Sequence, residues 1–308
     1  MFAGVDGGGT NTEACITDAN GTVLGRGLGG PANFHSVGER GVIAAVNAAL
    51  CAALAEAAIS TYDLSGICVA LAGAGLPEDK NRIVDCLQPF MGWIPLTVVE
   101  DTQSALVAAH GENNGMVVIA GTGSNCVGVN GDAYASVGGW GALLGDDGSA
   151  YQIALCGLRA AIYSYEGLSP ESSLVNSFME CIGAERMRDL IRIVNAMDRA
   201  QIAALSRLVF LAAAGGDSIS TAIVNKEAHA LAKLATRAAE RLSLASPNVV
   251  LVGGCFQNDV YVRGFTEHLT DMLPHASVRL ARVPSCEGAA MLARGVRCGT
   301  AKEEKQRV

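Results

Sequence analysis

Clustered cysteines are missing from this sequence of 308 residues. The ten cysteines are scattered along the chain, and none forms a Cys-x-x-Cys pair. Structural zinc sites and iron–sulfur clusters need several ligands at short spacing, so the pattern argues against both. Several of the cysteines lie within apolar runs, which favours buried, reduced thiols in a cytoplasmic protein.

Signals for secretion or membrane insertion are also missing. The first residues, Met1–Asp6, carry no basic segment followed by an apolar one, so they do not resemble a signal peptide. The most apolar stretch, 42–59, is rich in alanine and is interrupted by Asn47 and Glu56. We therefore predict a buried helix there and no membrane partner. The tail at 302–307 is predicted to be a solvated chain end.

Basic residues are in the minority. The chain has 22 Lys and Arg against 30 Asp and Glu, which gives a formal charge of 22 − 30 = −8. An acidic surface repels phosphate backbones, so we predict that nucleic acid is not a partner. An anionic ligand such as ATP would then need a local site made of backbone N–H groups and a metal ion.

One pattern occurs twice along the chain. It consists of an apolar strand, a Gly/Thr turn, a second strand, an Asn-Gly pair and a third strand. The first copy spans 2–27 with its turn at 7–10, and the second spans 116–137 with its turn at 121–124. Asn-Gly is a strong hairpin signal. Two lobes that arose by duplication would produce this repeat, although two unrelated meanders would match it as well.

Helices and strands are expected to alternate through the rest of the chain. Between the two copies we expect helices at 41–59, 78–89 and 101–110 and strands at 66–72 and 96–99. After the second copy we expect a largely helical region at 149–244, strands at 249–252 and 278–281, and a helix at 287–297. This order predicts an α/β fold of about two domains with a mostly buried sheet, divided at the loop 111–115.

The first Gly/Thr turn has the chemistry of a phosphate-binding loop. Three glycines after a strand allow the backbone N–H groups to approach an anion. Asp6 at the strand end could hold magnesium through water, and Thr10 and Thr12 offer hydroxyls. The turn fits neither the P-loop pattern nor Gly-x-Gly-x-x-Gly. A glycine-rich hairpin without a ligand is an equally good interpretation of this turn alone.

The second turn, within 120–125, repeats this chemistry. Two such loops in matching contexts suit the phosphate chain of ATP better than either loop does alone. Gly253 and Gly254 end a later strand and would let a flat base lie against bare backbone.

Two aspartates are candidates for the chemistry. Asp101 follows an apolar strand and opens a helix. It is either an N-cap residue, the commoner role, or a general base that accepts the proton of a hydroxyl attacking a γ-phosphate. Asp146 lies with Trp140 in a glycine-rich stretch and could bind sugar hydroxyls, whereas the neighbouring Asp147 equally suits a helix N-terminus.

Taken in order, these motifs resemble the actin-like ATPase superfamily and, within it, the N-acetylglucosamine kinase and BadF/BadG/BcrA/BcrD ATPase group. The matching positions extend over nearly the whole chain and comprise 4–12, Asn33, Glu100-Asp101, 120–125, 139–151, 252–254 and 287–290.

The resemblance implies a two-lobed actin-like ATPase (ribonuclease H-like) α/β fold with an ATP cleft between the lobes. The N-terminal lobe would comprise 1–111 and 285–308, and the C-terminal lobe 112–284. The implied cofactors are ATP and Mg²⁺, the implied small-molecule partner is an amino sugar, and the family favours a homodimer.

The resemblance also implies residue roles. Asp101 would be the catalytic base for the sugar 6-hydroxyl, and Asp6 would bind magnesium, through water. The residues implied to bind ATP are Gly7, Gly8, Gly9, Thr10, Asn11 and Thr122 at the phosphates and Gly253 and Gly254 at adenosine. The residues implied to bind the sugar are Asn33, Asp101, Gly123, Ser124, Trp140 and Asp146.

The expected activity is ATP-dependent phosphorylation of N-acetylglucosamine to its 6-phosphate. Glucosamine and N-acetylmuramic acid are alternative substrates, because they differ from it by only one or two substituents. A BadF-type ATPase activator is a further alternative that the cysteine pattern disfavours, and a non-catalytic sensor of sugar or ATP is another. Repressor-type sugar kinases usually carry a cysteine-rich zinc segment, which this sequence lacks.

Overall fold

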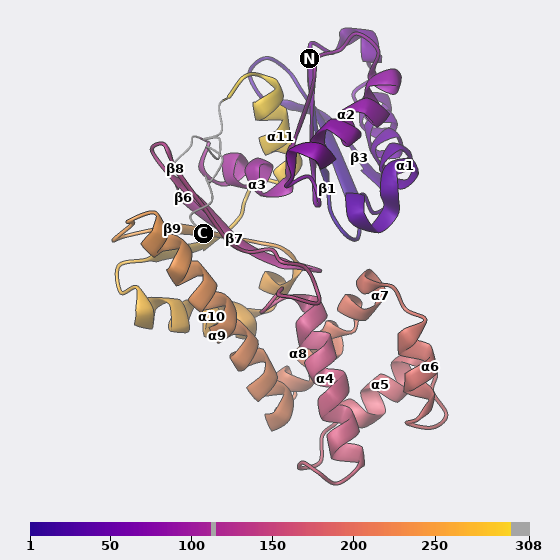
Figure 1. The fold of residues 1–308 in the computed structure, drawn as a ribbon, viewed down its shortest axis with the longest axis vertical. Coiled ribbons are helices and arrows are strands. Elements are labelled where there is room, and N and C mark those ends of the chain that lie inside the picture. Colours follow the sequence, from indigo (N-terminus) through magenta and orange to yellow (C-terminus); the bar gives the residue numbers. More distant parts are fainter. Residues whose placement is uncertain (112–114, 297–308) are drawn as a thin grey trace. The chain divides into compact units, whose positions relative to one another are not determined.

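The computed structural model describes residues 1–111 and 115–296 (Figure 1). The expected boundary loop at 111–115 therefore lies largely outside the described residues, and the tail at 302–307 lies wholly outside them. The chain divides into two compact units, one of residues 1–117, 128–135 and 281 onward, the other of residues 118–127 and 136–280. The described residues form two five-stranded sheets with helices between the strands, which confirms the predicted α/β class.

The first sheet is mixed and has the order β3-β2-β1-β4-β5. Its strands are β1 (Phe2–Gly7), β2 (Thr12–Thr17), β3 (Val23–Gly29), β4 (Gly66–Leu71) and β5 (Leu96–Glu100). Strands β1, β2 and β3 pair antiparallel, and the predicted Asn20-Gly21 turn joins β2 to β3. Strands β1, β4 and β5 pair parallel, with Asp6 opposite Ala70 and Leu71 opposite Glu100. Their carboxyl ends therefore share one edge of the sheet.

Helix α1 (Phe34–Glu56) packs against β3 through small residues on both elements. A Cβ added to Gly25, Gly27 or Gly29 would lie 2.1–2.4 Å from a backbone oxygen of the helix. Those oxygens belong to Ala53, Ala49 and Ala45, so alternate residues of the strand match successive turns of the helix. The bare strand lets the alanine face of the helix approach it closely.

The predicted start at Gly41 lies close to the start of the long helical segment that follows a kink at Gly38, but the first turns of α1, before this kink, were not predicted. The helix begins at Phe34 with Asn33 as its N-cap, and it continues through Gly38, whose φ of +64° is not helical. Within the described ranges, α1 is the one helix that by itself is long and apolar enough to cross a membrane by length and composition. A buried core helix passes the same test, and the alanine face of α1 is buried against the sheet.

Helix α11 (Ser285–Ala293) lies between β1 and α3 (Asp101–His110), again through glycines. A Cβ on Gly4 would lie 2.0 Å from the Cys286 oxygen, and one on Gly288 would lie 2.0 Å from the Ser104 oxygen. This close packing fixes the helix that begins with Asp101. The remaining elements of this part of the chain are η1 (Thr61–Asp63) and α2 (Pro77–Met91).

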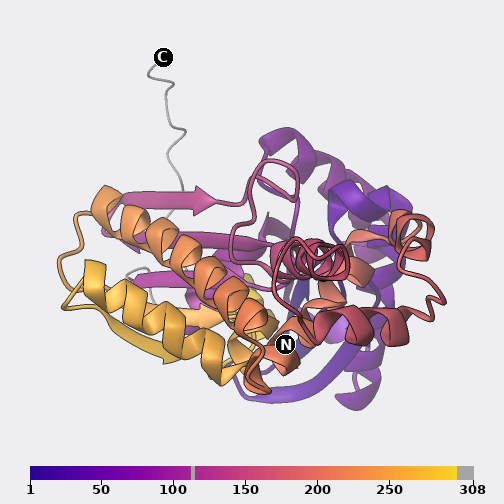
Figure 2. The same cartoon turned by 90° about the horizontal axis from the view of Figure 1, so that it is seen from below.

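The second sheet has the order β10-β9-β6-β7-β8. Its strands are β6 (Gly115–Ala120), β7 (Ser124–Asn130), β8 (Ala133–Gly138), β9 (Asn248–Val252) and β10 (Ser277–Leu280). The predicted helical region consists of α4 (Ala150–Tyr165), α5 (Leu174–Ile182), α6 (Asp189–Asn195), α7 (Arg199–Ala204), α8 (Ser206–Ala214) and α9 (Ser218–Arg241). The short η2 (Gly254–Gln257) leads to α10 (Asp259–Met272), which packs beside α9 (Figure 2).

Candidate active site

The glycine turn after β1 is closed by backbone hydrogen bonds. The Gly8 N–H donates to the Asn11 oxygen at 3.0 Å, and the Gly8 oxygen accepts from the N–H groups of Ala32 and Asn33, also at 3.0 Å. Gly7 has no room for a side chain, because a Cβ would lie 2.4 Å from the Leu71 side chain. Gly8 and Gly9 are partly exposed, so their backbone remains accessible to a ligand.

Asn33 connects this turn to helix α1. Its backbone N–H donates to Gly8, while its side-chain oxygen accepts from the His35 N–H at 3.1 Å and caps the helix. The capping role uses the amide oxygen, so the amide nitrogen is the group that Asn33 can offer to a ligand.

Two carboxylates and a hydroxyl meet at the carboxyl edge of the first sheet. The Ser104 hydroxyl lies 3.3 Å from Asp6 Oδ1 and 2.8 Å from the backbone oxygen of Asp101. Asp101 Oδ1 accepts from the Thr102 N–H at 3.0 Å. The N-cap interpretation of Asp101 was wrong, because Glu100 occupies the N-cap and Asp101 is the first helical residue. The sequence analysis did not single out Ser104.

The two carboxylates are placed where an added proton or cation is favoured. Burial raises the pKa of Asp6 to about 8, with repulsion from Asp101 as the next cause. Burial also raises the pKa of Asp101 to about 7, and Glu100 adds to the shift. A divalent cation would relieve this repulsion.

These residues fit magnesium. Among the described residues, no three His, Cys, Asp or Glu side chains form a group that could hold a metal ion. Magnesium is commonly held by one or two carboxylates together with water and substrate phosphates, so the Asp6 carboxylate is enough for such a site.

The second glycine turn is held by helix α4 and by the end of β9. The Gly121 N–H donates to the Gly123 oxygen at 2.9 Å, and the Gly121 oxygen accepts from the Ala150 N–H at 2.9 Å. Gly253 has a φ of +112°, and a Cβ on it would lie 2.4 Å from the Ala120 oxygen. The backbone of Gly253 therefore packs directly against the start of the turn, which explains the need for glycine there.

The segment 138–149 is fixed onto this turn at several points. The Ser124 hydroxyl donates to the Asp147 oxygen at 2.7 Å, and the Gly148 N–H donates to the buried Glu227 carboxylate at 2.9 Å. The Gln152 side chain donates to the backbone oxygens of Ala142 and Gly145, at 3.2 and 3.0 Å. Trp140 is 73% exposed, so its indole is available as a binding surface.

Asp146 is the buried member of an ion pair. It has a φ of +62°, which is unusual for a residue other than glycine, and only 3% of its surface is exposed. Its carboxylate pairs with Arg199, at the start of α7, and its Oδ1 lies 3.4 Å from the Ser124 N–H. Burial raises the pKa of Asp146, while Arg199 opposes the shift. The sequence analysis missed Arg199, because it lies 53 residues further along the chain in a helical region without a motif.

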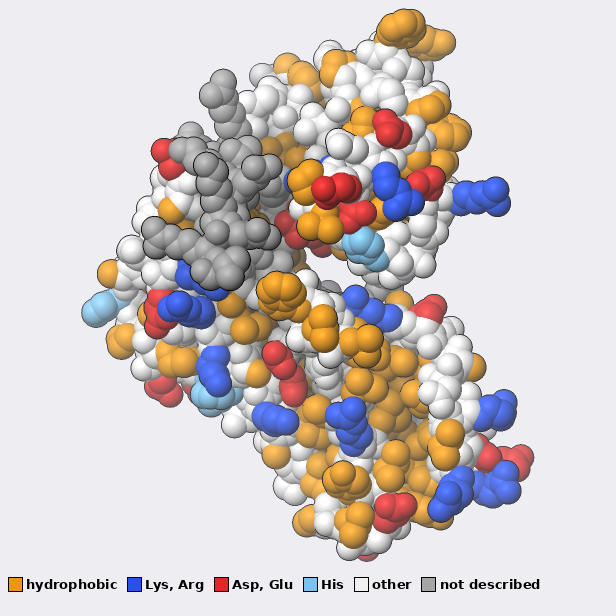
Figure 3. Space-filling model, viewed as in Figure 1, with side chains coloured by type: hydrophobic (Ala, Val, Ile, Leu, Met, Phe, Trp, Pro, Cys, Tyr) orange, Lys and Arg blue, Asp and Glu red, His pale blue; other side chains and the backbone are white. Residues whose placement is uncertain are grey.

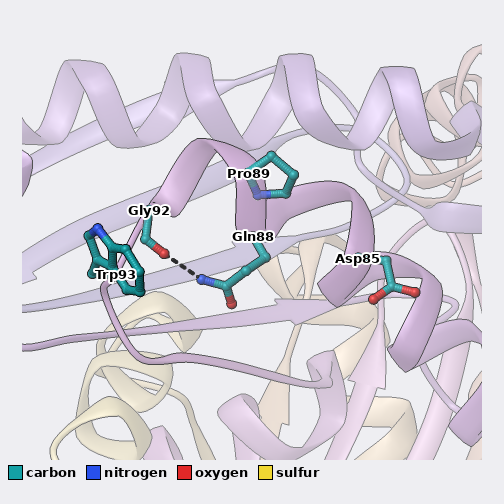
Figure 4. A pocket seen from close by; sticks show the side chains of 5 residues that line it. All are labelled: Asp85, Gln88, Pro89, Gly92 and Trp93. Atoms are coloured by element: carbon teal, nitrogen blue, oxygen red, sulfur yellow. Dashed lines mark hydrogen bonds between the residues drawn. The ribbon is translucent and has the colours of Figure 1, made fainter.

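The predicted residues thus fall into two sets. The first unit brings together Asp6, Asp101, Asn33 and the turn 7–11, and the second brings together Gly123, Ser124, Trp140, Asp146 and Gly253. None of them lines the pocket of about 390 Å³ at the end of α2, which is formed by Asp85, Gln88, Pro89, Gly92 and Trp93 (Figure 4).

Comparisons with known proteins find relatives that match along nearly the whole chain. The N-acetylmuramic acid/N-acetylglucosamine kinase of Clostridium acetobutylicum is 30% identical over 297 residues, covering 94% of this chain and 97% of the relative. The N-acetyl-D-glucosamine kinase of Dictyostelium discoideum is 29% identical over 310 residues, covering 95% and 97%. The crystal structure of a proposed N-acetylglucosamine kinase from Chromobacterium violaceum matches with a TM-score of 0.78 at 23% identity, covering 95% and 98%.

A family model described as the BadF/BadG/BcrA/BcrD ATPase family matches residues 3–293. The match includes both glycine turns, Asp101, Asp146 and Gly253. The chain therefore belongs to the BadF/BadG/BcrA/BcrD ATPase family.

Proposed function

We propose that the chain transfers the γ-phosphoryl group of ATP to the 6-hydroxyl of N-acetylglucosamine. The observation that carries the proposal is the placement of Asp6 and Asp101 beside the first glycine turn, at the shared carboxyl edge of β1, β4 and β5. Open α/β sheets bind their ligands at this edge.

The coarser assignment, an ATP-dependent amino sugar kinase, follows from the ATPase family and from relatives that match over nearly the full length of the chain. The choice of N-acetylglucosamine is ours. N-acetylmuramic acid is the second candidate, because one of these relatives acts on both sugars by its name.

Asp101 would act as the general base. Its raised pKa of about 7 makes the ionised carboxylate a stronger proton acceptor near neutral pH than an ordinary aspartate. The sugar 6-hydroxyl would lose its proton to this carboxylate as its oxygen attacks the γ-phosphorus and the bond to the β-phosphate oxygen breaks. The Thr102 N–H holds one carboxylate oxygen and leaves the other for the substrate.

Asp6 would hold magnesium through water, and that cation would offset the charge of the ATP phosphates. The backbone of Gly7, Gly8, Gly9 and Asn11, with the Thr10 and Thr122 side chains, would bind the phosphates. Gly253 and Gly254 would lie against adenosine. Sugar contacts are assigned to Asn33, Gly123, Ser124, Trp140 and Asp146.

The remaining proposals concern the whole protein. We propose lobes of 1–111 with 285–308 and of 112–284, a cytoplasmic location, and neither nucleic acid nor membrane as a partner. Among the described residues, five cysteines are buried, whereas Cys51 and Cys181 are exposed, so the predicted burial was wrong for these two. We also propose a homodimer. Apolar side chains gather on the surface of the second unit (Figure 3). The exposed apolar residues of this unit include Tyr163, Leu168 and Leu211, and such side chains would gain from burial.

The substitution Asp101→Asn tests the base. We expect the variant to bind ATP normally and to lose phosphoryl transfer by about 100- to 10,000-fold, because the amide cannot accept the proton. The matched control is Asp85→Asn at an exposed position of the same unit, which should keep full activity. Turnover within a few-fold of wild type in Asp101→Asn would remove Asp101 from the mechanism.

A further inference from the structure

The ion pair between Asp146 and Arg199 presents its arginine, and not its aspartate, to the surroundings. The Asp146 side chain is 3% exposed, whereas the Arg199 side chain is 33% exposed. Both Asp146 oxygens already have protein partners, in Arg199 and the Ser124 N–H. A ligand that reaches this point therefore meets the guanidinium before the carboxylate.

Bare backbone makes room for this guanidinium. A Cβ on Gly123 would lie 2.5 Å from Arg199 Nη2 and 3.0 Å from Asp146 Oδ2. Any other residue at position 123 would push the arginine away from the turn. The guanidinium thus lies directly over the Gly123–Ser124 backbone, where the sugar contacts are proposed.

The guanidinium has donor capacity that the protein does not use. Arg199 Nε is buried and has no hydrogen-bond partner among the described residues. An arginine carries five N–H donors and no acceptor, so an added ligand at this point must supply acceptor oxygens. A buried donor without a partner is costly, so the protein alone does not satisfy this arginine, and a ligand oxygen would meet the exposed part of its side chain.

The charges around Arg199 limit which ligand groups would bind to it. Asp146 offsets the arginine charge, and the exposed Asp147 lies next to it in sequence. A further carboxylate is therefore not strongly attracted, while a neutral carbonyl oxygen is a good acceptor. The ammonium group of a free amino sugar has no acceptor and would face the exposed cation.

We propose that Arg199 is a substrate-binding residue that donates to the carbonyl oxygen of an N-acyl amino sugar and so selects it over the free amine. Asp146, which is assigned above to the sugar site, would then act there through Arg199, as a positioning residue that holds the guanidinium over Gly123. The inference rests on the proposed sugar kinase function and assigns recognition of the N-acyl group to Arg199.

The test measures kcat/KM for N-acetylglucosamine and for glucosamine in wild type, Arg199→Met, Arg199→Lys and Asp146→Asn. Arg192→Met, at an exposed position of the neighbouring helix α6, is the matched control. Wild type should prefer the N-acetylated sugar. Arg199→Met should lower kcat/KM for N-acetylglucosamine by about 10- to 100-fold, which is the loss expected for one charged hydrogen bond. The kcat/KM for glucosamine should stay within about 3-fold of the wild-type value.

Three further outcomes are expected. The ATP KM should stay within about 3-fold in every variant, since the lost contact is to the sugar. Arg199→Lys should keep part of the preference. The Asp146→Asn/Arg199→Met double variant should lose no more than Arg199→Met alone, because Asp146 acts through Arg199.

Other results would overturn the inference. If Arg199→Met keeps the wild-type preference for N-acetylglucosamine over glucosamine, another group must bind the acetamide. Equal losses for both sugars and ATP would indicate a structural role. If the wild-type protein releases no ADP with any sugar, both the proposed function and the inference are refuted. If the release depends on sugar but Arg199→Met keeps the wild-type preference for N-acetylglucosamine over glucosamine, the inference alone is refuted.

Discussion

Gly288 of α11 provides a sensitive test of how Asp101 is positioned. A Cβ at this position would lie 2.0 Å from the Ser104 oxygen and 2.7 Å from the Ala108 N, both on the backbone of α3. Neither atom can move without moving the helix. In Gly288→Ala, the two helices must therefore separate by roughly 1 Å or more to reach ordinary van der Waals distance.

This separation has a cost in stability. Overpacking a core costs about 1–3 kcal/mol, and contact with backbone on both sides places this case near the upper end. For a chain of this size, we expect about 3 kcal/mol to lower the Tm by roughly 6–10 °C. Asp101 lies one turn before Ser104, so the same movement should lower kcat by roughly 10-fold or more.

The assay pairs a thermal melt with steady-state kinetics. Gly30→Ala is the matched control, because a Cβ on that exposed glycine meets nothing within 4 Å. It should leave both the Tm and kcat unchanged. A Gly288→Ala variant with wild-type Tm and kcat would refute the packing that places Asp101.

Three further predictions follow from individual residues. The folded pKa of Asp6, about 8, exceeds its unfolded value of 3.8, so without magnesium the folded protein binds more protons and loses stability as pH rises between these values. Melts in EDTA should show this fall, and Asp6→Asn should reduce it; an identical profile in the variant would contradict the prediction. Gly253→Ala should raise the ATP KM more than the sugar KM, since its Cβ would lie 2.4 Å from the Ala120 oxygen, and equal effects in steady-state kinetics would argue against an adenosine site. Asp146→Ala should raise the sugar KM far more than the ATP KM, which the same kinetics would test.

The sequence predicted the elements that local chemistry determines. Both glycine turns, the Asn20-Gly21 hairpin and the helix beginning at Asp101 lie where strand and turn signals placed them. The start of α1 was missed because Gly38 interrupts the helical pattern with a positive φ that a helix normally excludes. Asn33 caps the helix eight residues before the predicted start at Gly41 (41 − 33 = 8) and sets the observed boundary.

Contacts between distant segments could not be predicted. Arg199 has no motif around it, and only the folded chain brings it onto Asp146. Ser104 is likewise an ordinary helical serine until β1 places Asp6 beside it. The alternating glycines of β3 could not be interpreted from the sequence either, because the reason for them is the close packing of α1 against this strand.

The most direct test of the central claim is ADP release from ATP and magnesium with a panel of sugars and a no-sugar blank. The panel comprises N-acetylglucosamine, N-acetylmuramic acid, glucosamine and glucose. We predict sugar-dependent release with the highest kcat/KM for N-acetylglucosamine and one sugar 6-phosphate formed for each ADP. Release equal to the blank for every sugar would contradict the kinase assignment and point to an ATPase activator or a sensor.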